Sequence, residues 1–265
     1  MPTIAPFARR SRLFPALLTA LLTCAAVLAP LATAWAAPPA AFPADSKFVG
    51  AYCAGASTND KLGDAPAGIS DRDIVGDATH PAFFTYDDGT YAYFRIRVAG
   101  DPVATKGGSA PLNQFGWGVG MDVDGDLKTI EYAWVVNGID ETVNLTDNVS
   151  KKTSFKIWTP TLDTSKAGVD GQIFATGYVQ VKAVTDGSTF GKDGDFWITV
   201  ALPMDEAVAA TSGQAKPLNW GKVRLWVSTS TNGFTLDKDF MCWDEALGIV
   251  DNAQAVSDPI VLGPY

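Results

Sequence analysis

Strict alternation of apolar and polar residues between Tyr91 and Val136 is the feature that most constrains the fold of this chain. Successive side chains of a β-strand point to opposite faces, so a period of two residues predicts a strand with one buried face. In residues 91–99 the apolar positions are Ala92, Phe94, Ile96 and Val98, and the alternating positions are Tyr91, Tyr93, Arg95 and Arg97. We therefore expect a half-buried strand whose outer face carries rings and guanidinium groups.

A second alternating pair follows in residues 115–136. The large side chains on one face are Phe115, Trp117, Val119, Met121 and Val123, and the opposite face is mostly glycine: Gly116, Gly118 and Gly120. Asp124-Gly125 is typical of a hairpin turn. The return strand then places Ile130, Tyr132, Trp134 and Val136 on the buried face.

Further strands are predicted near residues 153–158, 173–182, 196–202 and 223–227, with turns at Asn137-Gly138, Asp186-Gly187 and Asp193-Gly194. Short helical fragments are expected after Pro203 and over residues 243–247. The 29 acids include only four Glu, and Asp prefers turns to helix interiors. The predicted fold is all-β, an antiparallel two-sheet sandwich (jelly-roll-like) with one or two short helices.

Residues 1–36 have the pattern of a secretory signal peptide: Arg9, Arg10 and Arg12, an apolar run, then Ala34-Trp35-Ala36. A retained membrane anchor and a lipoprotein linked through Cys24 are the alternatives. Residues 37–46 contain three prolines and are expected to form an extended tether. Residues 47–265 are expected to form a single domain with no membrane span. We expect a secreted protein, extracellular or periplasmic.

The formal net charge is −9, and it becomes −12 when the three arginines leave with the leader. Such a charge excludes nucleic acid as an expected partner, because a phosphate backbone would be repelled. Removal of the leader leaves Cys53 and Cys242. In an oxidising compartment we expect them to form a disulfide, the alternative being two buried free thiols.

An Asp-rich hairpin is the candidate metal site. Asp122, Asp124 and Asp126 alternate along the chain and Glu131 follows, so their carboxylates could converge on Ca²⁺ at the end of a strand. The alternative is an ordinary Asp-Gly turn with solvated acids. Weaker candidates are Asp193 with Asp195 and Asp237 with Asp239.

The outer face of the sheet is the candidate ligand site. If the strands at Tyr91 and Phe115 are neighbours, rings and guanidinium groups lie beside a strip without side chains, and glycine in a strand often marks a close approach. Aromatic rings stack on sugar C–H faces, and Arg donates to hydroxyls and carboxylates. The predicted platform comprises Tyr91, Tyr93, Arg95, Arg97, Gly116, Gly118, Gly120, Trp197, Arg224 and Trp226. The alternative is that a loop or the N-terminal segment covers this face.

Catalytic and haem sites are not expected. His80 is the only histidine, and neither a haem-attachment motif nor a nucleophile, zinc or phosphate-loop motif occurs. With 25 Asp dispersed along the chain, a carboxylate pair suited to glycoside hydrolysis arises easily by chance. A secreted glycoside hydrolase is therefore only the third alternative, and we expect no enzyme.

Three segments resemble the DOMON-like superfamily, which includes the family 9 carbohydrate-binding modules. They are residues 84–98, with an acidic turn and an aromatic strand, residues 118–126, with a strand ending in an Asp-rich hairpin, and residues 195–203, with a strand ending in Leu202-Pro203. Their order and spacing agree over about residues 80–230. The resemblance implies a secreted β-sandwich that binds sugars, haem or a partner surface.

From these observations we expect a secreted, non-catalytic β-sandwich that binds a polysaccharide or cell-surface glycan, with Ca²⁺ as a stabilising ion. The alternative is a structural or adhesive surface protein whose sheet face docks another protein.

Overall fold

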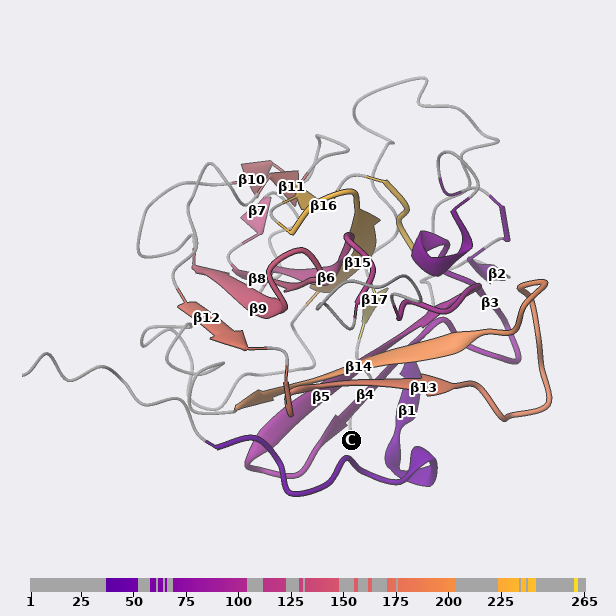
Figure 1. Ribbon diagram of the computed structural model, residues 1–265, viewed down its shortest axis with the longest axis horizontal. Coiled ribbons are helices and arrows are strands. Elements are labelled where there is room, and N and C mark those ends of the chain that lie inside the picture. The colour runs from indigo at the N-terminus through magenta and orange to yellow at the C-terminus, as the bar shows by residue number, and fades with distance from the viewer. Residues whose placement is uncertain are drawn as a thin grey trace, which may run out of the picture. The chain divides into compact units, whose positions relative to one another are not determined.

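Two antiparallel sheets organise the chain (Figure 1). The structure, a computed structural model, describes residues 37–51, 58–60, 62, 63, 65, 69–103, 112–122, 129, 130, 132–147, 155, 156, 162, 163, 171–174, 176–203, 224–233, 235, 236, 238–241, 260 and 261. All of them lie in one compact unit, Trp35–Tyr265.

The five-stranded sheet has the order β1-β4-β5-β14-β13, and the six-stranded sheet has the order β12-β9-β8-β6-β15-β17. The first is built from β1 (Val49–Ala51), β4 (Phe83–Asp87), β5 (Tyr91–Val98), β14 (Phe196–Pro203) and β13 (Val179–Ala183). The second is built from β12 (Gly171–Phe174), β9 (Thr142–Asp147), β8 (Tyr132–Asn137), β6 (Gly116–Asp122), β15 (Arg224–Ser230) and β17 (Ile260–Val261).

Smaller elements complete the described structure. The short strands are β2 (Thr58–Asp60), β3 (Gly76–Asp77), β7 (Thr129–Ile130), β10 (Phe155–Lys156), β11 (Leu162–Asp163) and β16 (Thr235–Leu236), and the 3₁₀ turns are η1 (Asp45–Lys47) and η3 (Ser70–Arg72). The prediction of an all-β two-sheet sandwich is confirmed. The helical fragments expected after Pro203 and over residues 243–247 lie outside the described residues.

The core lies where the predicted apolar faces of the two sheets meet. The rings of Phe94 in β5 and Trp134 in β8 contact each other across it, with centroids 5.3 Å apart. Trp117 and Val119 of β6 are fully buried in the same cluster. β6 pairs antiparallel with β8 as predicted, so that Gly118 lies opposite Val135, and the expected turn at Asp124-Gly125 lies outside the described residues.

Two expectations were wrong. First, β5 is not half-buried, because all eight of its residues are buried. Second, residues 173–182 do not form one strand, because β12 and β13 belong to different sheets. Gly177 lies between them with φ +84°, a left-handed conformation that turns the chain at little cost when the residue is glycine.

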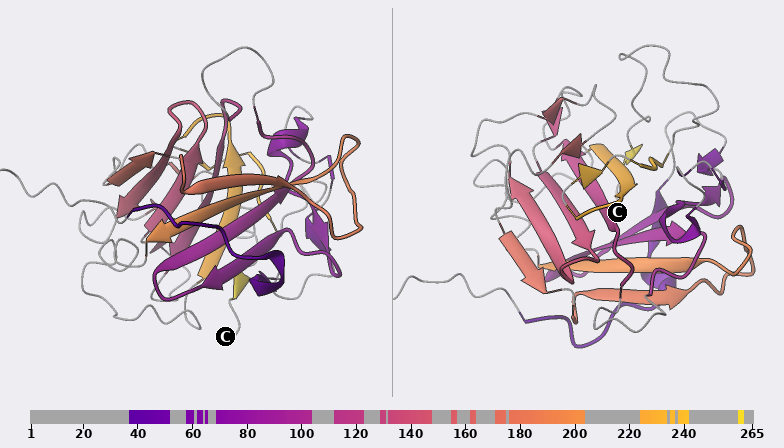
Figure 2. Two further views of the ribbon diagram at one scale, coloured as in Figure 1. Left: turned by 60° about the horizontal axis from the view of Figure 1, so that its bottom comes forward. Right: turned by 45° about the horizontal axis from the view of Figure 1, so that its top comes forward.

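Residues 37–48, which we call the N-terminal strap, cover the outer face of the five-stranded sheet. In the left view of Figure 2 this indigo segment crosses in front of the sheet. The segment ends in η1 and continues directly into β1, which pairs with β4. The predicted tether is therefore extended for most of its length, but it packs against the sheet.

Candidate functional site

The predicted ligand residues are divided between the two sheets. Tyr91, Tyr93, Arg95 and Arg97 lie on β5 and Trp197 on β14, in the five-stranded sheet, whereas Gly116, Gly118, Gly120, Arg224 and Trp226 lie in the six-stranded sheet. The assumption that β5 and β6 are neighbours was wrong, because β5 pairs with β4 and β14. A single platform containing all ten residues does not form. The outer face of the five-stranded sheet is the candidate site.

Arg95 forms a charge cluster with residues from two other elements. Its Nη1 donates to Oδ1 of Asp45 in the strap at 2.9 Å, and the Nζ of Lys182 in β13 donates to Oδ2 of the same carboxylate at 2.5 Å. The hydrogen bond from Lys182 lowers the pKa of Asp45, burial opposes this, and the hydrogen bond from Arg95 lowers it further. Asp45 is therefore held as a carboxylate between two cations.

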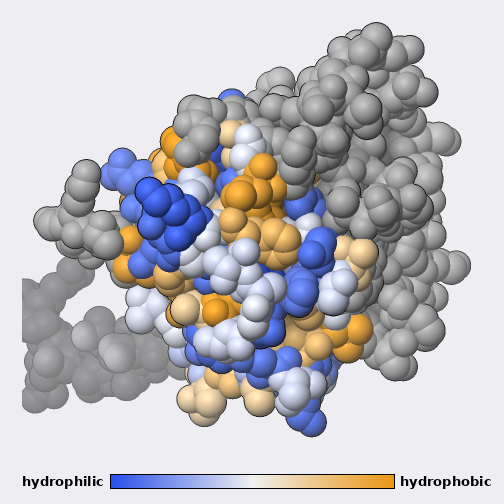
Figure 3. Space-filling view, turned by 90° about the vertical axis from the view of Figure 1, so that its right-hand side faces the viewer, coloured by the Kyte–Doolittle hydropathy of each residue, from blue (hydrophilic) through white to orange (hydrophobic). Residues whose placement is uncertain are grey.

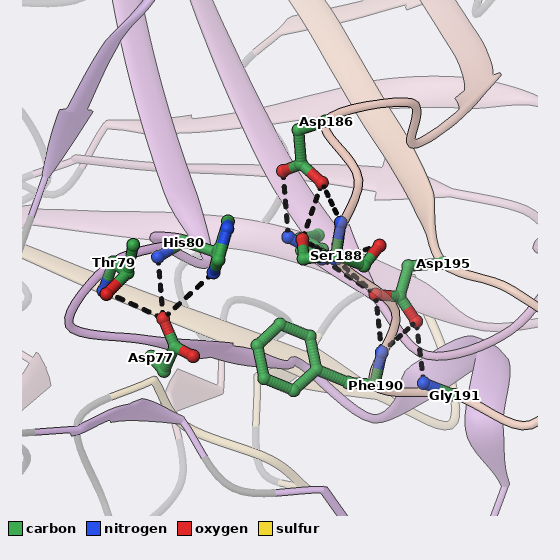
Figure 4. A network of polar contacts seen from close by, with 9 residues as sticks. Asp77, Thr79, His80, Asp186, Ser188, Phe190, Gly191 and Asp195 are labelled. Carbon is green, nitrogen blue, oxygen red and sulfur yellow. Dashed lines mark hydrogen bonds and ion pairs between the residues drawn. The ribbon is translucent and has the colours of Figure 1, made fainter.

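Arg97 is held in a different way, by groups of the loop between β13 and β14. Its Nε and Nη2 donate to Oδ2 of Asp195 at 2.9 and 2.5 Å. Its Nη1 donates to Asp186, and its Nη2 also donates to the Ser188 hydroxyl. The amides of Phe190 and Gly191 donate to the Asp195 carboxylate (Figure 4). With its donors occupied in this way, Arg97 fastens the loop to β5 and is a structural residue.

Asp195 was also a weaker candidate for metal binding. Its side chain is fully buried, and its oxygens accept hydrogen bonds from Arg97 and from two backbone amides. A carboxylate committed to these donors does not present its oxygens to a cation. The structure therefore assigns Asp195 to the set of ion pairs and hydrogen bonds that fixes Arg97, which we call the lock on Arg97.

Trp197 is not free to stack on a sugar. The guanidinium carbons of Arg95 and Arg97 each lie 5.5 Å from its ring centroid, and Phe84 meets the ring edge-on at 5.1 Å. These contacts use the indole as part of a cation–π stack. The predicted role of Trp197 as an open aromatic surface is not compatible with this packing.

Three tyrosines form the aromatic part of the face. Tyr93 stacks on Tyr86 with centroids 5.8 Å apart, and Tyr91 lies 5.9 Å from Tyr93. Burial and the hydrogen bond to Asp88 raise the pKa of Tyr93, so its hydroxyl stays protonated at physiological pH. The hydroxyl of Tyr91 donates to the carbonyl oxygen of Ala37.

The strap covers these tyrosines with aromatic rings of its own. Phe42 and Phe48 approach Tyr93 at 6.1 and 6.4 Å, both edge-on. Phe48 also lies 3.7 Å from the guanidinium carbon of Arg95. The strap therefore contacts the sheet through a ring, a carboxylate and a second ring, spaced three residues apart.

His80 lies at one end of the five-stranded sheet, near the lock on Arg97. Its Nδ1 is 3.3 Å from Oδ1 of Asp77, and that oxygen also accepts the amides of Thr79 and His80 (Figure 4). These backbone hydrogen bonds lower the pKa of Asp77 although burial raises it. Figure 3 looks onto this side of the molecule, where hydrophilic groups and separate hydrophobic patches alternate.

The glycine strip on β6 is buried as well. A Cβ on Gly116 would overlap the carbonyl oxygen of Asn232, and one on Gly118 would overlap the carbonyl oxygen of Trp134. The close approach at these glycines is therefore made by backbone. Gly120 lies opposite Trp226 of β15, and both are buried. The side chain of Arg224 is outside the description.

The metal and disulfide predictions fall mostly outside the described residues. Asp122 ends β6, but Asp124, Asp126, Glu131, Cys53 and Cys242 are not described. Within the described ranges there is no group of three or more His, Cys, Asp or Glu that could hold a metal ion. The Ca²⁺ site stays a prediction, which the melting temperature measured with Ca²⁺ and with a chelator tests.

Sequence reasoning missed Asp45 and Lys182. Asp45 lies in a segment whose prolines indicated a tether, and Lys182 lies on an edge strand where an exposed lysine is common. The only local signal for Asp45 is its place between Phe42 and Phe48, because disordered segments contain few aromatic residues.

A comparison of the sequence with protein-family models finds no match, and a comparison with curated proteins finds no significant one. The function is therefore argued from the site itself. In the described part of the chain, no helix has the length and hydropathy needed to cross a membrane.

Proposed function

We propose that this protein is a secreted, non-catalytic β-sandwich that binds a polysaccharide or cell-surface glycan through the outer face of its five-stranded sheet. One observation supports this most directly. Arg95 and Lys182, which lie on separate strands, both donate hydrogen bonds to the carboxylate of Asp45, which belongs to the strap. Three tyrosines in ring contact lie on the same face, with Tyr93 stacked on Tyr86 and Tyr91 tilted against Tyr93. Aromatic rings beside cationic donors suit a ligand with C–H faces and many oxygen atoms.

The strap has to leave this face before a glycan can bind. Its pairing with the sheet begins only at Val49, so residues 37–48 can lift away without breaking any strand ladder. Exposing the rings of Phe42 and Phe48 costs at most about 3–6 kcal/mol, at 1.5–3 kcal/mol for each side chain. Loss of the Asp45 ion pairs and of the hydrogen bond from Tyr91 to Ala37 adds to this cost. The form in which the strap has left the sheet is then a minor population. The apparent affinity for the glycan equals the affinity of this open form multiplied by the fraction of molecules that are open.

Glycan-array binding of the wild type and of Phe42→Ala tests the proposal. The variant loosens the strap, and we expect it to bind the same glycans roughly five- to thirtyfold more tightly. Ile139→Ala is the control, because Ile139 is an exposed hydrophobic residue outside the strap and the sheet face. If both the wild type and Phe42→Ala bind no glycan in the presence of Ca²⁺, the proposal is wrong.

A structural or adhesive protein that docks another protein is the second candidate. The observation in its favour is that this face already holds a polypeptide segment through rings, an ion pair and a backbone carbonyl. Light scattering combined with size-exclusion chromatography tests it. A mass that rises with protein concentration supports docking between copies, and a constant monomer mass opposes it.

A further inference from the structure

We propose that the ligand of this face is a polysaccharide that carries carboxylates, such as a uronic acid polymer, and that the Asp45 side chain occupies the position of a ligand carboxylate. The inference rests on the proposed glycan function and adds the charge of the ligand. It makes the strap an internal competitor for the site.

The first argument is the placement of the charges. The two cations belong to β5 and β13, and the anion belongs to the strap. The side chain of Arg95 is 3% exposed, whereas those of Asp45 and Lys182 are 45% and 43% exposed. The sheet thus supplies a fixed cationic receptor, and the anion that occupies it enters from the solvent side.

The second argument is that Asp45 does not use all the donors of Arg95. Nε of Arg95 donates to the Thr199 hydroxyl at 3.0 Å, and Nη1 donates to Asp45. Nη2 is buried and has no hydrogen-bond partner among the described residues. A carboxylate can bind both terminal nitrogens of a guanidinium in a fork, and such paired bonds are stronger than a single one. The receptor therefore has one more donor than its present occupant uses.

Arg97, on the same strand, does not have this shortfall. Both arginines are buried on the same face of β5, but Arg97 donates through Nε, Nη1 and Nη2 to two aspartates and Ser188. A buried guanidinium with an unpaired donor loses free energy. This loss of free energy occurs at Arg95, whose acceptor, Asp45, belongs to the strap, a segment that can be displaced.

The third argument concerns the pattern of the strap. A ring, a carboxylate and a second ring occupy the tyrosines and the two cations. A uronic acid polymer presents the same alternation, since each sugar has a C–H face and a carboxylate. A neutral glycan would leave both cations without a counter-charge, and this is costly at Arg95, whose charge is buried.

The test is calorimetric titration with polygalacturonate and with the same polymer after reduction of its carboxylates. Asp45→Asn removes the competing charge with little change of shape. We expect it to bind polygalacturonate about three- to thirtyfold more tightly than the wild type, as the loss of two ion pairs implies. Lys182→Gln should bind about three- to tenfold more weakly. The reduced polymer should bind all variants weakly and equally.

Lys192→Gln is the matched control, because Lys192 is an exposed lysine in the β13–β14 loop. We expect its affinity to equal that of the wild type. The net negative charge of the protein repels a polyanion over long distances. The titrations are therefore made at about 0.15 M salt, where charges more than about 8 Å apart are screened and this repulsion is weaker than at low salt. A cooperative thermal transition confirms that each variant is folded.

The outcomes separate this inference from the function on which it rests. Equal binding of both polymers, with no effect of Asp45→Asn, overturns the inference and leaves glycan binding standing. Failure of every glycan to bind the wild type, Asp45→Asn and Phe42→Ala overturns both. Binding of polyglutamate that Asp45→Asn strengthens, without any glycan binding, also overturns the inference and favours the docking of acidic proteins.

Discussion

Arg97 and Asp195 form an ion pair in which neither side chain reaches solvent. The pair joins β5 to the loop before β14, and backbone amides of Phe190 and Gly191 supply further donors to the carboxylate. Removal of one partner of a buried pair leaves the other charge desolvated and uncompensated. The stability of this end of the sheet therefore depends on the complete arrangement.

We expect Asp195→Asn to lower the free energy of unfolding by about 3–5 kcal/mol, the cost of leaving a buried partner unpaired. Urea denaturation followed by tryptophan fluorescence measures the change. Asp193→Asn is the control, because Asp193 lies two residues away and is exposed. A loss below about 1 kcal/mol for Asp195→Asn would contradict the assignment of this pair as a lock.

Two buried tryptophans differ in their hydrogen bonding. The indole nitrogen of Trp117 donates to the carbonyl oxygen of Asp71 at 2.8 Å, whereas Nε1 of Trp134 has no partner in the described part of the chain. Replacement by Phe removes similar ring volume at both positions but leaves an unsatisfied carbonyl only at Asp71. We expect Trp117→Phe to cost about 1–3 kcal/mol more than Trp134→Phe. Chemical denaturation of both variants checks this, and the reverse order would be inconsistent with it.

Gly191 is required by a close approach of two backbones. A Cβ at this position would overlap the carbonyl oxygen of Ala99, so we expect Gly191→Ala to destabilise the protein by about 1–3 kcal/mol or more. Gly187→Ala is the comparison, because Gly187 has φ +88° and open space around it. That variant should cost only about 1–2 kcal/mol of backbone strain. Melting temperatures of the two variants show which substitution destabilises the protein more, and we expect the lower value for Gly191→Ala.

The pKa of Asp45 gives a pH dependence with a definite sign. Because the folded-state pKa is lower than the ordinary value of 3.8, Asp45 contributes stability above that value. This contribution disappears as the pH falls through the lowered pKa. We expect the wild type to be more stable than Asp45→Asn at pH 7 and the two to converge as the pH falls below 3.8 and through the lowered pKa of Asp45. Denaturation midpoints across this range test the convergence, and a gap that widens in acid would refute it.

The disulfide between Cys53 and Cys242 stays a prediction. Reduction of an intact bond adds two hydrogen atoms to the mass and should lower the stability by about 2–5 kcal/mol. Mass spectrometry of the alkylated protein with and without reductant detects the bond, and urea denaturation under the same two conditions measures the loss of stability. Two thiols that react with the alkylating agent before reduction would show that the bond is absent.

The faces of the strands could be predicted from the sequence because the pleat is local. Phe94, Trp117 and Trp134 lie in the core as their alternation indicates. The outer face could not be predicted, because alternation identifies a second face without saying what lies on it. Arg95 and Arg97 were taken for exposed residues, but aspartates from distant segments allow both to be buried.

The sequence by itself determined the period of the strands, the glycine turns at Asp186-Gly187 and Asp193-Gly194, and the apolar residues of the core, since each depends on neighbours within a few positions. Only the tertiary structure decided which strands pair and what covers them. Asp45 and Lys182 are 137 positions apart, and Arg97 and Asp195 are 98 positions apart. Contacts over such separations depend on the packing of the whole domain, so the covered face and its carboxylate receptor became visible only in three dimensions.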